Sequence, residues 1–145
     1  MAQPFEKSPS TIVLVDDDFD IRSVTKEILK IKGYLVRDFE RSVDAIEHIR
    51  LSRPDLILCD IAMPEMDGLE ATRVIRTREA ASGLHIPIVA MTANAMKGDR
   101  ERCLDTGMDG YLSKPIRAET LYETIEAHSP PLEAPIETDS PESGK

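Results

Sequence analysis

Residues 11–18 read Thr-Ile-Val-Leu-Val-Asp-Asp-Asp, a short apolar run that ends in three acidic residues. The pattern returns further along the chain, because Asp60 follows the apolar run 56–59 and Lys114 comes shortly after the apolar pair 111–112. Each charged group therefore stands where a short buried strand is expected to end. In an open parallel sheet the carboxyl ends of the strands share one edge, and ligands bind there. We expect these groups to meet at that edge although they are far apart in the sequence.

The charges expected at this edge indicate a metal site. Asp16, Asp17 and Asp60 would bring three like charges together, which is costly unless a cation joins them. Ligand sets made only of oxygen suit Mg²⁺, which takes few protein carboxylates and keeps several waters. With Lys114 beside them, these carboxylates point to phosphoryl chemistry.

Apolar runs alternate with amphipathic segments along the chain. Strands are expected at 11–15, 34–38, 55–59, 86–91 and 110–112, and helices at 19–32, 42–52, 69–78, 95–106 and 117–128. Alternation of this kind predicts an α/β fold, in which a parallel sheet is covered by helices on both faces.

The helical segments carry apolar residues at a spacing close to the helical period. Three helices supply the clearest sets, namely Ile21, Val24, Ile28 and Ile31, then Val43, Ile46 and Ile49, then Leu121 and Ile125. We expect these residues to form the inward faces. Asp18 and Ser42 stand where each could cap the helix that follows it.

The composition limits the fold and the function. A length of 145 residues points to one domain, and 41% hydrophobic against 4% aromatic residues predicts an aliphatic core. Cys59 and Cys103 lack metal or redox spacing, and Cys59 is expected to be a small buried side chain. A net charge of −9 argues against nucleic-acid binding, which needs clustered Lys and Arg.

The segments outside the expected fold have a different character. Residues 1–10 lack the apolar region of a signal peptide, and no apolar run approaches the roughly 20 residues of a membrane span. We therefore expect a cytoplasmic protein with no membrane contact and a disordered segment at 1–10. Residues 129–145 hold four Pro, four acidic residues and one Lys, so we expect a disordered acidic tail or linker.

Four stretches together resemble the receiver domains of two-component response regulators. They are Val-Leu-Val-Asp-Asp-Asp at 13–18, Asp-Ile-Ala-Met-Pro-Glu-Met-Asp-Gly at 60–68, Met-Thr-Ala-Asn-Ala at 91–95 and Gly-Tyr-Leu-Ser-Lys-Pro at 110–115. The stretches follow the family's order and spacing, and the resemblance covers residues 11–128. The run 92–99 looks most like receivers of hybrid sensor histidine kinases. The resemblance implies a flavodoxin-like doubly wound (βα)5 fold, with a parallel sheet in the order 2-1-3-4-5 and helices on both faces.

The resemblance also implies roles in phosphoryl transfer. Asp60 would accept the phosphoryl group, and Lys114 would pair with the carboxylates and later with a phosphoryl oxygen. Thr92 would donate a hydrogen bond to the phosphoryl group, and Tyr111 would be the aromatic switch residue. The peptide bond between Lys114 and Pro115 would be cis.

For the metal, the family pattern separates the acidic residues. Asp17 and Asp60 would bind Mg²⁺ directly, and Asp16 would act through a bound water. The backbone carbonyl of Ala62 would supply the third protein oxygen. Asp18 lies one place beyond the acidic pair, and its expected role is the helix cap rather than the metal.

A receiver of this kind takes a phosphoryl group from a phosphohistidine, on a histidine kinase or a histidine phosphotransfer protein, and changes its affinity for a partner. The transfer would be self-catalysed and followed by slow autodephosphorylation, so the domain would be an enzyme only in a marginal sense. We expect a monomer.

Two other functions remain open on the sequence. A pseudo-receiver would be a pure interaction module, although neither the acidic residues nor Lys114 is missing. A phosphatase of the haloacid-dehalogenase type would carry Asp-x-Asp followed by a hydroxyl residue, whereas Phe19 and Asp20 follow the acidic run here. A nucleotide-binding protein is disfavoured, because the chain has no Gly-x-x-x-x-Gly-Lys loop.

Overall fold

The computed structural model describes residues 10–63, 66–93 and 97–128. Strands and helices alternate through these residues in the order β1 Thr11–Val15, α1 Phe19–Ile31, β2 Leu35–Phe39, α2 Ser42–Leu51, β3 Leu56–Asp60, α3 Gly68–Ala80, β4 Ile88–Thr92, α4 Lys97–Thr106, β5 Gly110–Ser113 and α5 Ala118–His128. Residues 1–9 and 129–145, for which the sequence predicts disorder, lie outside the described part of the chain.

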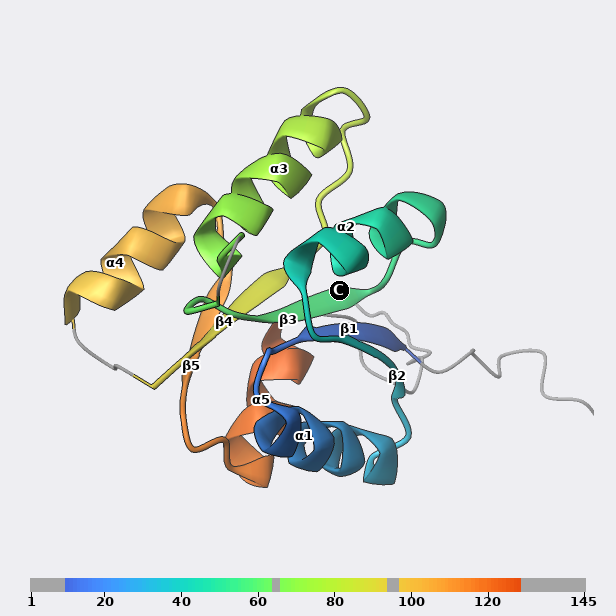
Figure 1. Ribbon diagram of the computed structural model, residues 1–145, viewed down its shortest axis with the longest axis vertical. Coiled ribbons are helices and arrows are strands. Elements are labelled where there is room, and N and C mark those ends of the chain that lie inside the picture. Colours follow the sequence, from blue (N-terminus) through green and yellow to red (C-terminus); the bar gives the residue numbers. More distant parts are fainter. Residues whose placement is uncertain (1–9, 64–65, 94–96, 129–145) are drawn as a thin grey trace, which may run out of the picture.

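The five strands form one parallel sheet in the order β2-β1-β3-β4-β5. Helices α2, α3 and α4 cover one face, and α1 and α5 cover the other (Figure 1). The strand order reverses between β1 and β3, and a sheet of this type binds its ligands at the carboxyl edge beside that point. The doubly wound fold is thereby confirmed.

The core lies in two layers, one on each side of the sheet. Strand residues alternate between the layers, so that Val13 belongs to the layer under α2, α3 and α4 whereas Leu14 belongs to the layer under α1 and α5. The buried hydrophobic residues are mostly aliphatic, as the composition predicts, and both cysteines are buried thiols. Leu121 and Ile125 of α5 are almost completely buried, which confirms their inward assignment.

Helix α1 presents a different face to the sheet from the one its apolar spacing predicts. Val24 and Ile31 are 59% and 79% exposed, while Thr25 and Leu29 are buried. At 100° per residue, Val24 and Ile31 lie about 140–160° around the helix from Leu29. The predicted face was therefore wrong at these two positions, because the apolar residues of α1 spread over a wider arc than the sheet can cover.

The start of α2 also differs from the prediction. Arg41, not Ser42, is the N-cap residue, and Ser42 is the first helical residue with its side chain buried. Val43 is 38% exposed rather than inward, whereas Ile46 is buried. Asp18 caps α1 as expected, since its Oδ1 accepts a hydrogen bond from the Ile21 amide at 3.0 Å.

None of the helices in the described ranges combines the length and the apolar character needed to cross a membrane.

Candidate functional site

The register of the sheet aligns the strand ends that carry the charged residues. Val15 of β1 pairs with Cys59 of β3, so Asp16 and Asp60 occupy the next position on neighbouring strands. On the other side Asp60 pairs with Met91 of β4, one residue before Thr92. These residues therefore reach the carboxyl edge of the sheet together.

Lys114 arrives from β5 in the same way. Thr92 pairs with Ser113, and the Lys114 amide donates a hydrogen bond to the Thr92 carbonyl oxygen at 2.8 Å. The peptide bond between Lys114 and Pro115 is cis. The Lys114 Nζ lies 3.0 Å from Asp16 Oδ2 and 3.4 Å from Asp60 Oδ1. The ammonium is thus placed against two of the three carboxylates.

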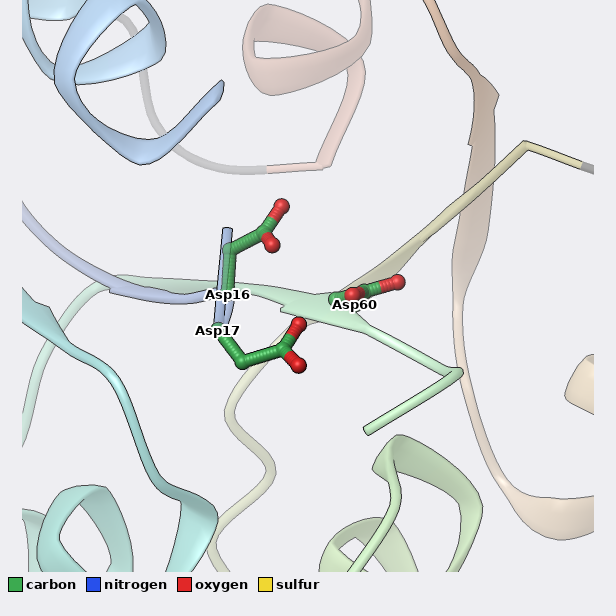
Figure 2. Close-up of side chains that lie close together, drawn as sticks. All are labelled: Asp16, Asp17 and Asp60. Carbon is green, nitrogen blue, oxygen red and sulfur yellow. The ribbon is translucent and has the colours of Figure 1, made fainter. Parts of the chain in front are cut away.

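The three carboxylates form one cluster. Asp16, Asp17 and Asp60 each offer an oxygen atom, and these atoms lie within 4.8 Å of one another. Figure 2 shows Asp16 and Asp17 extending from the end of β1 beside Asp60 at the end of β3. Asp16 and Asp60 are buried, whereas Asp17 is exposed and gives the cluster access to solvent.

The cluster is electrostatically unbalanced, since one ammonium faces three carboxylates. Burial and the neighbouring charge of Asp16 together raise the pKa of Asp60 to about 6, against the opposing influence of Lys114 and of the hydrogen bond from the Ala62 amide. Burial would lower the pKa of Lys114, but its contacts with Asp16 and Asp60 outweigh this and raise it. A cation bound here would relieve the repulsion between the carboxylates.

The remaining site residues expected from the sequence lie at or near the carboxyl ends of β3, β4 and β5. The Ala62 amide donates a hydrogen bond to Asp60 Oδ1 at 3.3 Å, and Ala62 itself is exposed. Thr92 is buried at the end of β4. Tyr111 is half-buried, packs against the core layer under α2, α3 and α4, and lines a surface pocket that also includes Lys114.

Two supporting residues were not predicted from the sequence. The first is Arg22 of α1, whose Nη1 donates to the Asp16 carbonyl oxygen at 2.7 Å and whose Nε pairs with Asp38 at 3.1 Å. Lys26 Nζ also pairs with Asp38 at 2.9 Å. Burial opposes the charge of Asp38, but Lys26 and Arg22 together lower its pKa. In the sequence, Arg22 and Lys26 are four residues apart and therefore lie on one helix face. This spacing was the signal that could have indicated a shared acidic partner.

The second is Gly68, the first residue of α3. A Cβ atom at this position would lie 2.5 Å from the Asp60 carbonyl oxygen and 2.9 Å from the Ile61 Cα. The start of α3 can therefore approach the backbone of Asp60 only because residue 68 has no side chain. Asp67 and Gly68 belong to the stretch 60–68 that resembles the family, but the distance of Gly68 from Asp60 in space was not visible in the sequence.

The donors present fit a hard divalent cation. They are carboxylate oxygens from Asp16, Asp17 and Asp60, and two of the three are buried in a site with excess negative charge. Asp16 Oδ2 pairs electrostatically with Lys114 but accepts no well-directed hydrogen bond from the described residues. Mg²⁺ uses few protein carboxylates of this kind.

Comparison with known proteins agrees with this geometry. Residues 12–126 match the model of the response regulator receiver domain. The chain is 39% identical over 122 residues to hybrid signal transduction histidine kinase I of Dictyostelium discoideum, which covers 81% of the chain and 7% of the kinase. It is 36% identical over 120 residues to the polar-differentiation response regulator DivK of Brucella anthropi, which covers 83% of the chain and 96% of DivK. The chain thus spans less than a tenth of the hybrid kinase and nearly all of DivK.

Solved structures give the same relationship. The receiver domain of the sensor histidine kinase PA1611 from Pseudomonas aeruginosa superposes with a TM-score of 0.75 at 37% identity, over 83% of this chain and 97% of that one. That structure is described with a magnesium ion coordinated in its active site cleft. The chemotaxis protein CheY4 of Vibrio cholerae superposes with a TM-score of 0.76 at 27% identity, over 83% of this chain and 98% of that one. This chain belongs to the response regulator receiver domain family of two-component signalling.

Proposed function

We propose that this receiver accepts a phosphoryl group on Asp60 in a Mg²⁺-dependent reaction and uses it to change partner binding. The observation that carries the proposal is the meeting of Asp16, Asp17, Asp60 and Lys114 at one edge of the sheet. The pseudo-receiver alternative is disfavoured, because all the charged residues that the reaction needs are present and lie close together.

In the proposed step an Asp60 carboxylate oxygen attacks the phosphorus of a phosphohistidine. An O–P bond forms as the N–P bond breaks, and the electron pair of that bond returns to the imidazole nitrogen. The Lys114 ammonium, which already lies 3.4 Å from Asp60 Oδ1, stabilises negative charge on the transferred group. Asp16, Asp17, Asp60 and the Ala62 carbonyl would hold Mg²⁺, which neutralises charge on the phosphoryl oxygens when bound.

The phosphoryl donor is proposed to be a histidine kinase or a histidine phosphotransfer protein. The support is the similarity to receivers of hybrid histidine kinases and to DivK. The donor histidine must reach Asp60 from the open side of the cluster, where Asp17 is exposed.

The output is proposed to pass through Thr92 and Tyr111. Asp60 and Thr92 end adjacent strands, so a phosphoryl group on Asp60 would place acceptor oxygens near the Thr92 hydroxyl. Movement of Thr92 towards them would vacate space beside β4, and Tyr111 lies on the adjacent strand β5. The face formed by α4, β5 and α5 would then change shape. Such coupling needs two packed arrangements of similar energy that the phosphoryl group biases.

Phosphorylation by a small donor tests the first part of the proposal. Intact mass spectrometry of the chain with acetyl phosphate and Mg²⁺ should show the addition of one phosphoryl group, and a chelator should prevent it. Asp60→Asn should abolish the addition, whereas Asp44→Asn, an identical change at an exposed position on α2, should leave it unchanged. A wild-type chain that stays unmodified with acetyl phosphate and with a phosphohistidine protein would instead support a pseudo-receiver.

Amide chemical shifts test the second part. Beryllofluoride with Mg²⁺ is a stand-in for the phosphoryl group, and its addition should perturb Thr92, Tyr111 and α5. Thr92→Ala should confine the changes to the neighbourhood of Asp60. If the wild-type changes already stop there, the proposed switch is wrong while the phosphoacceptor assignment survives.

A further inference from the structure

A second pocket lies at the opposite edge of the sheet from Asp60. It has a volume of about 440 Å³, and its apolar lining comes from the ends of α2 and α3 and from the loop before β4, namely Ile46, Ile49, Leu51, Ile75, Leu84 and Ile86. Two of these residues are unusually open to solvent, since Leu51 is 72% exposed and Leu84 is 50% exposed. An apolar surface of this kind is stabilised when another apolar group covers it.

The rim of this pocket is positively charged in a chain whose net charge is −9. Arg50, Arg53 and Arg78 all line it and are exposed. Arg50 pairs with Glu47, whose carboxylate also senses the charge of Arg78. Among the described residues, Arg53 and Arg78 form no ion pair, and the acidic Glu79 is already held by Arg76. The pocket therefore combines an aliphatic floor with cationic groups that face solvent.

We propose that residues 132–137 of this chain, Leu-Glu-Ala-Pro-Ile-Glu, cover the pocket. Leu132 and Ile136 are apolar, and each is followed directly by a glutamate, Glu133 or Glu137. The segment thus carries two pairs of an apolar and an acidic residue, four residues apart. The apolar residues match the floor of the pocket, and the acidic residues match its cationic rim. Pro135 within the segment restricts the free chain, which lowers the conformational entropy lost when the segment docks. This docking surface is separate from the phosphoacceptor site and does not depend on it.

Helix α5, after which this segment follows, ends at the same edge of the sheet as the pocket. His128 Nε2 lies 3.0 Å from the Asp109 carbonyl oxygen, and Asp109 Oδ1 lies 2.7 Å from His85 Nε2. His85 stands between Leu84 and Ile86, which both line the pocket. Two hydrogen bonds through Asp109 therefore connect the end of α5 with His85, which lies between two residues of the pocket lining.

The number of residues in the connection sets how far it can reach. Ile136 follows His128 by eight residues, which span up to about 26–29 Å when extended. Helix α5 covers the opposite face of the sheet from α2 and α3, so the segment would pass around the edge where β4 and β5 begin (Figure 1).

Two other occupants compete for the pocket. Residues 1–9 carry Phe5 and continue into Ser10, whose carbonyl oxygen accepts a hydrogen bond from Leu35 at the start of β2. In residues 1–9 the charges of Glu6 and Lys7 cancel, so this segment does not complement the cationic rim as residues 132–137 do. The second competitor is residues 132–137 of another copy of the chain. Docking between copies would depend on protein concentration, whereas docking within one chain would not.

A spin label at the end of the full-length chain tests the docking. Cys59 and Cys103 are buried, so the label is introduced at a new cysteine, Ser143→Cys. The label should broaden the Leu51 and Leu84 amide signals. Replacing both apolar anchors, Leu132→Ser with Ile136→Ser, should reduce this broadening several-fold, while Thr138→Ala should leave it unchanged. Equal broadening in all three chains would mean that the tail is only nearby, and would overturn the proposal.

Charge reversal gives an independent readout in the same labelled chain. Arg53→Glu with Arg78→Glu should reduce the broadening, and adding Glu133→Arg with Glu137→Arg should restore it. Lys30→Glu, an exposed reversal on α1, is the matched control and should have no effect. Broadening that passes from labelled to unlabelled copies in a mixed sample would assign the pocket to a second copy. A label at Ser8→Cys that broadens the pocket signals more than Ser143→Cys would assign it to residues 1–9. Either result would overturn the proposal.

Discussion

At the scale of single residues, Asp60 occupies an environment that disfavours its own charge. It is buried beside Asp16, and Lys114 and the Ala62 amide only partly offset the cost of its charge. The same arrangement places the carboxylate oxygens where they can bind a cation and the Lys114 ammonium where it can stabilise a phosphoryl group. The fold has already brought these charges together. The electrostatic cost of bringing these carboxylates together and their capacity to bind a cation therefore have one origin.

The raised pKa of Asp60 predicts how stability without metal depends on pH. The folded chain binds this proton more tightly than the unfolded chain, in which the ordinary value of 3.8 applies. The charge on Asp60 is therefore destabilising above about pH 6, and the penalty disappears as pH falls towards 4. In the presence of a chelator, Asp60→Asn should raise the melting temperature at pH 7.5. The difference in melting temperature between the variant and the wild-type chain should shrink by pH 4.5. A difference independent of pH would contradict the assignment.

Mg²⁺ binding should show the complementary dependence. The metal competes with the proton on Asp60, so its stabilising effect should weaken as pH falls below about 6. At ten times its dissociation constant a ligand adds about 1.4 kcal/mol, which raises the melting temperature by a few degrees. Thermal unfolding at pH 7.5 should show that shift, and Asp17→Ala should remove most of it. A shift equally large at pH 5 would mean that Mg²⁺ binds elsewhere.

Gly68 should be the residue whose replacement disturbs the site without removing any of its chemical groups. Gly68→Ala places a methyl group 2.5 Å from the Asp60 carbonyl oxygen, so backbone must move. We expect a loss of about 1–3 kcal/mol in the free energy of unfolding and weaker Mg²⁺ binding. Urea unfolding measures the first effect and metal titration the second.

Gly98→Ala is the control for this change. Residue 98 lies in α4, and a Cβ atom there would meet nothing within 4 Å. Alanine should stabilise that helix by roughly 0.5–1 kcal/mol. Similar effects of the two substitutions would show that the close approach at Gly68 does not constrain Asp60.

At the scale of elements, helix α1 shows where periodicity in the sequence is informative and where it is not. The spacing identified the helix correctly, but it assigned Val24 and Ile31 to a face that turns away from the sheet. Periodicity records which residues are apolar, whereas the position of the helix is decided by packing over the sheet and by polar contacts such as that of Arg22 with Asp16. Those contacts join residues whose proximity depends on the fold.

Two substitutions that delete the same number of atoms test the observed face of α1. Leu29 is completely buried and Ile31 is 79% exposed. Leu29→Ala should cost about 2–5 kcal/mol in the free energy of unfolding. Ile31→Ala should change it by no more than about 0.5 kcal/mol. Denaturant unfolding of the two variants measures both, and equal losses would favour the face expected from the apolar spacing.

At the scale of the whole molecule, the parallel sheet explains why residues from four distant stretches meet at one edge. Alternating apolar and amphipathic segments were enough to predict the α/β class and the positions of the elements, with errors of a few residues at their ends. They did not fix the strand order, which came from resemblance to a family and agrees with the structure. The candidate site was predictable because Asp16, Asp60 and Lys114 each mark a strand end. Arg22 and Gly68 were missed because they act through backbone atoms that are near only in the folded chain.

The location of the acyl phosphate tests the central claim most directly. Borohydride reduces an aspartyl phosphate to homoserine, so the modified residue can be identified by fragmenting the peptide that contains it. After phosphorylation with Mg²⁺, homoserine should occur at position 60 and not at Asp55 or Asp67, the other aspartates nearby in the sequence. Homoserine at Asp16, Asp17 or either of those positions, with Asp60 unchanged, would contradict the account.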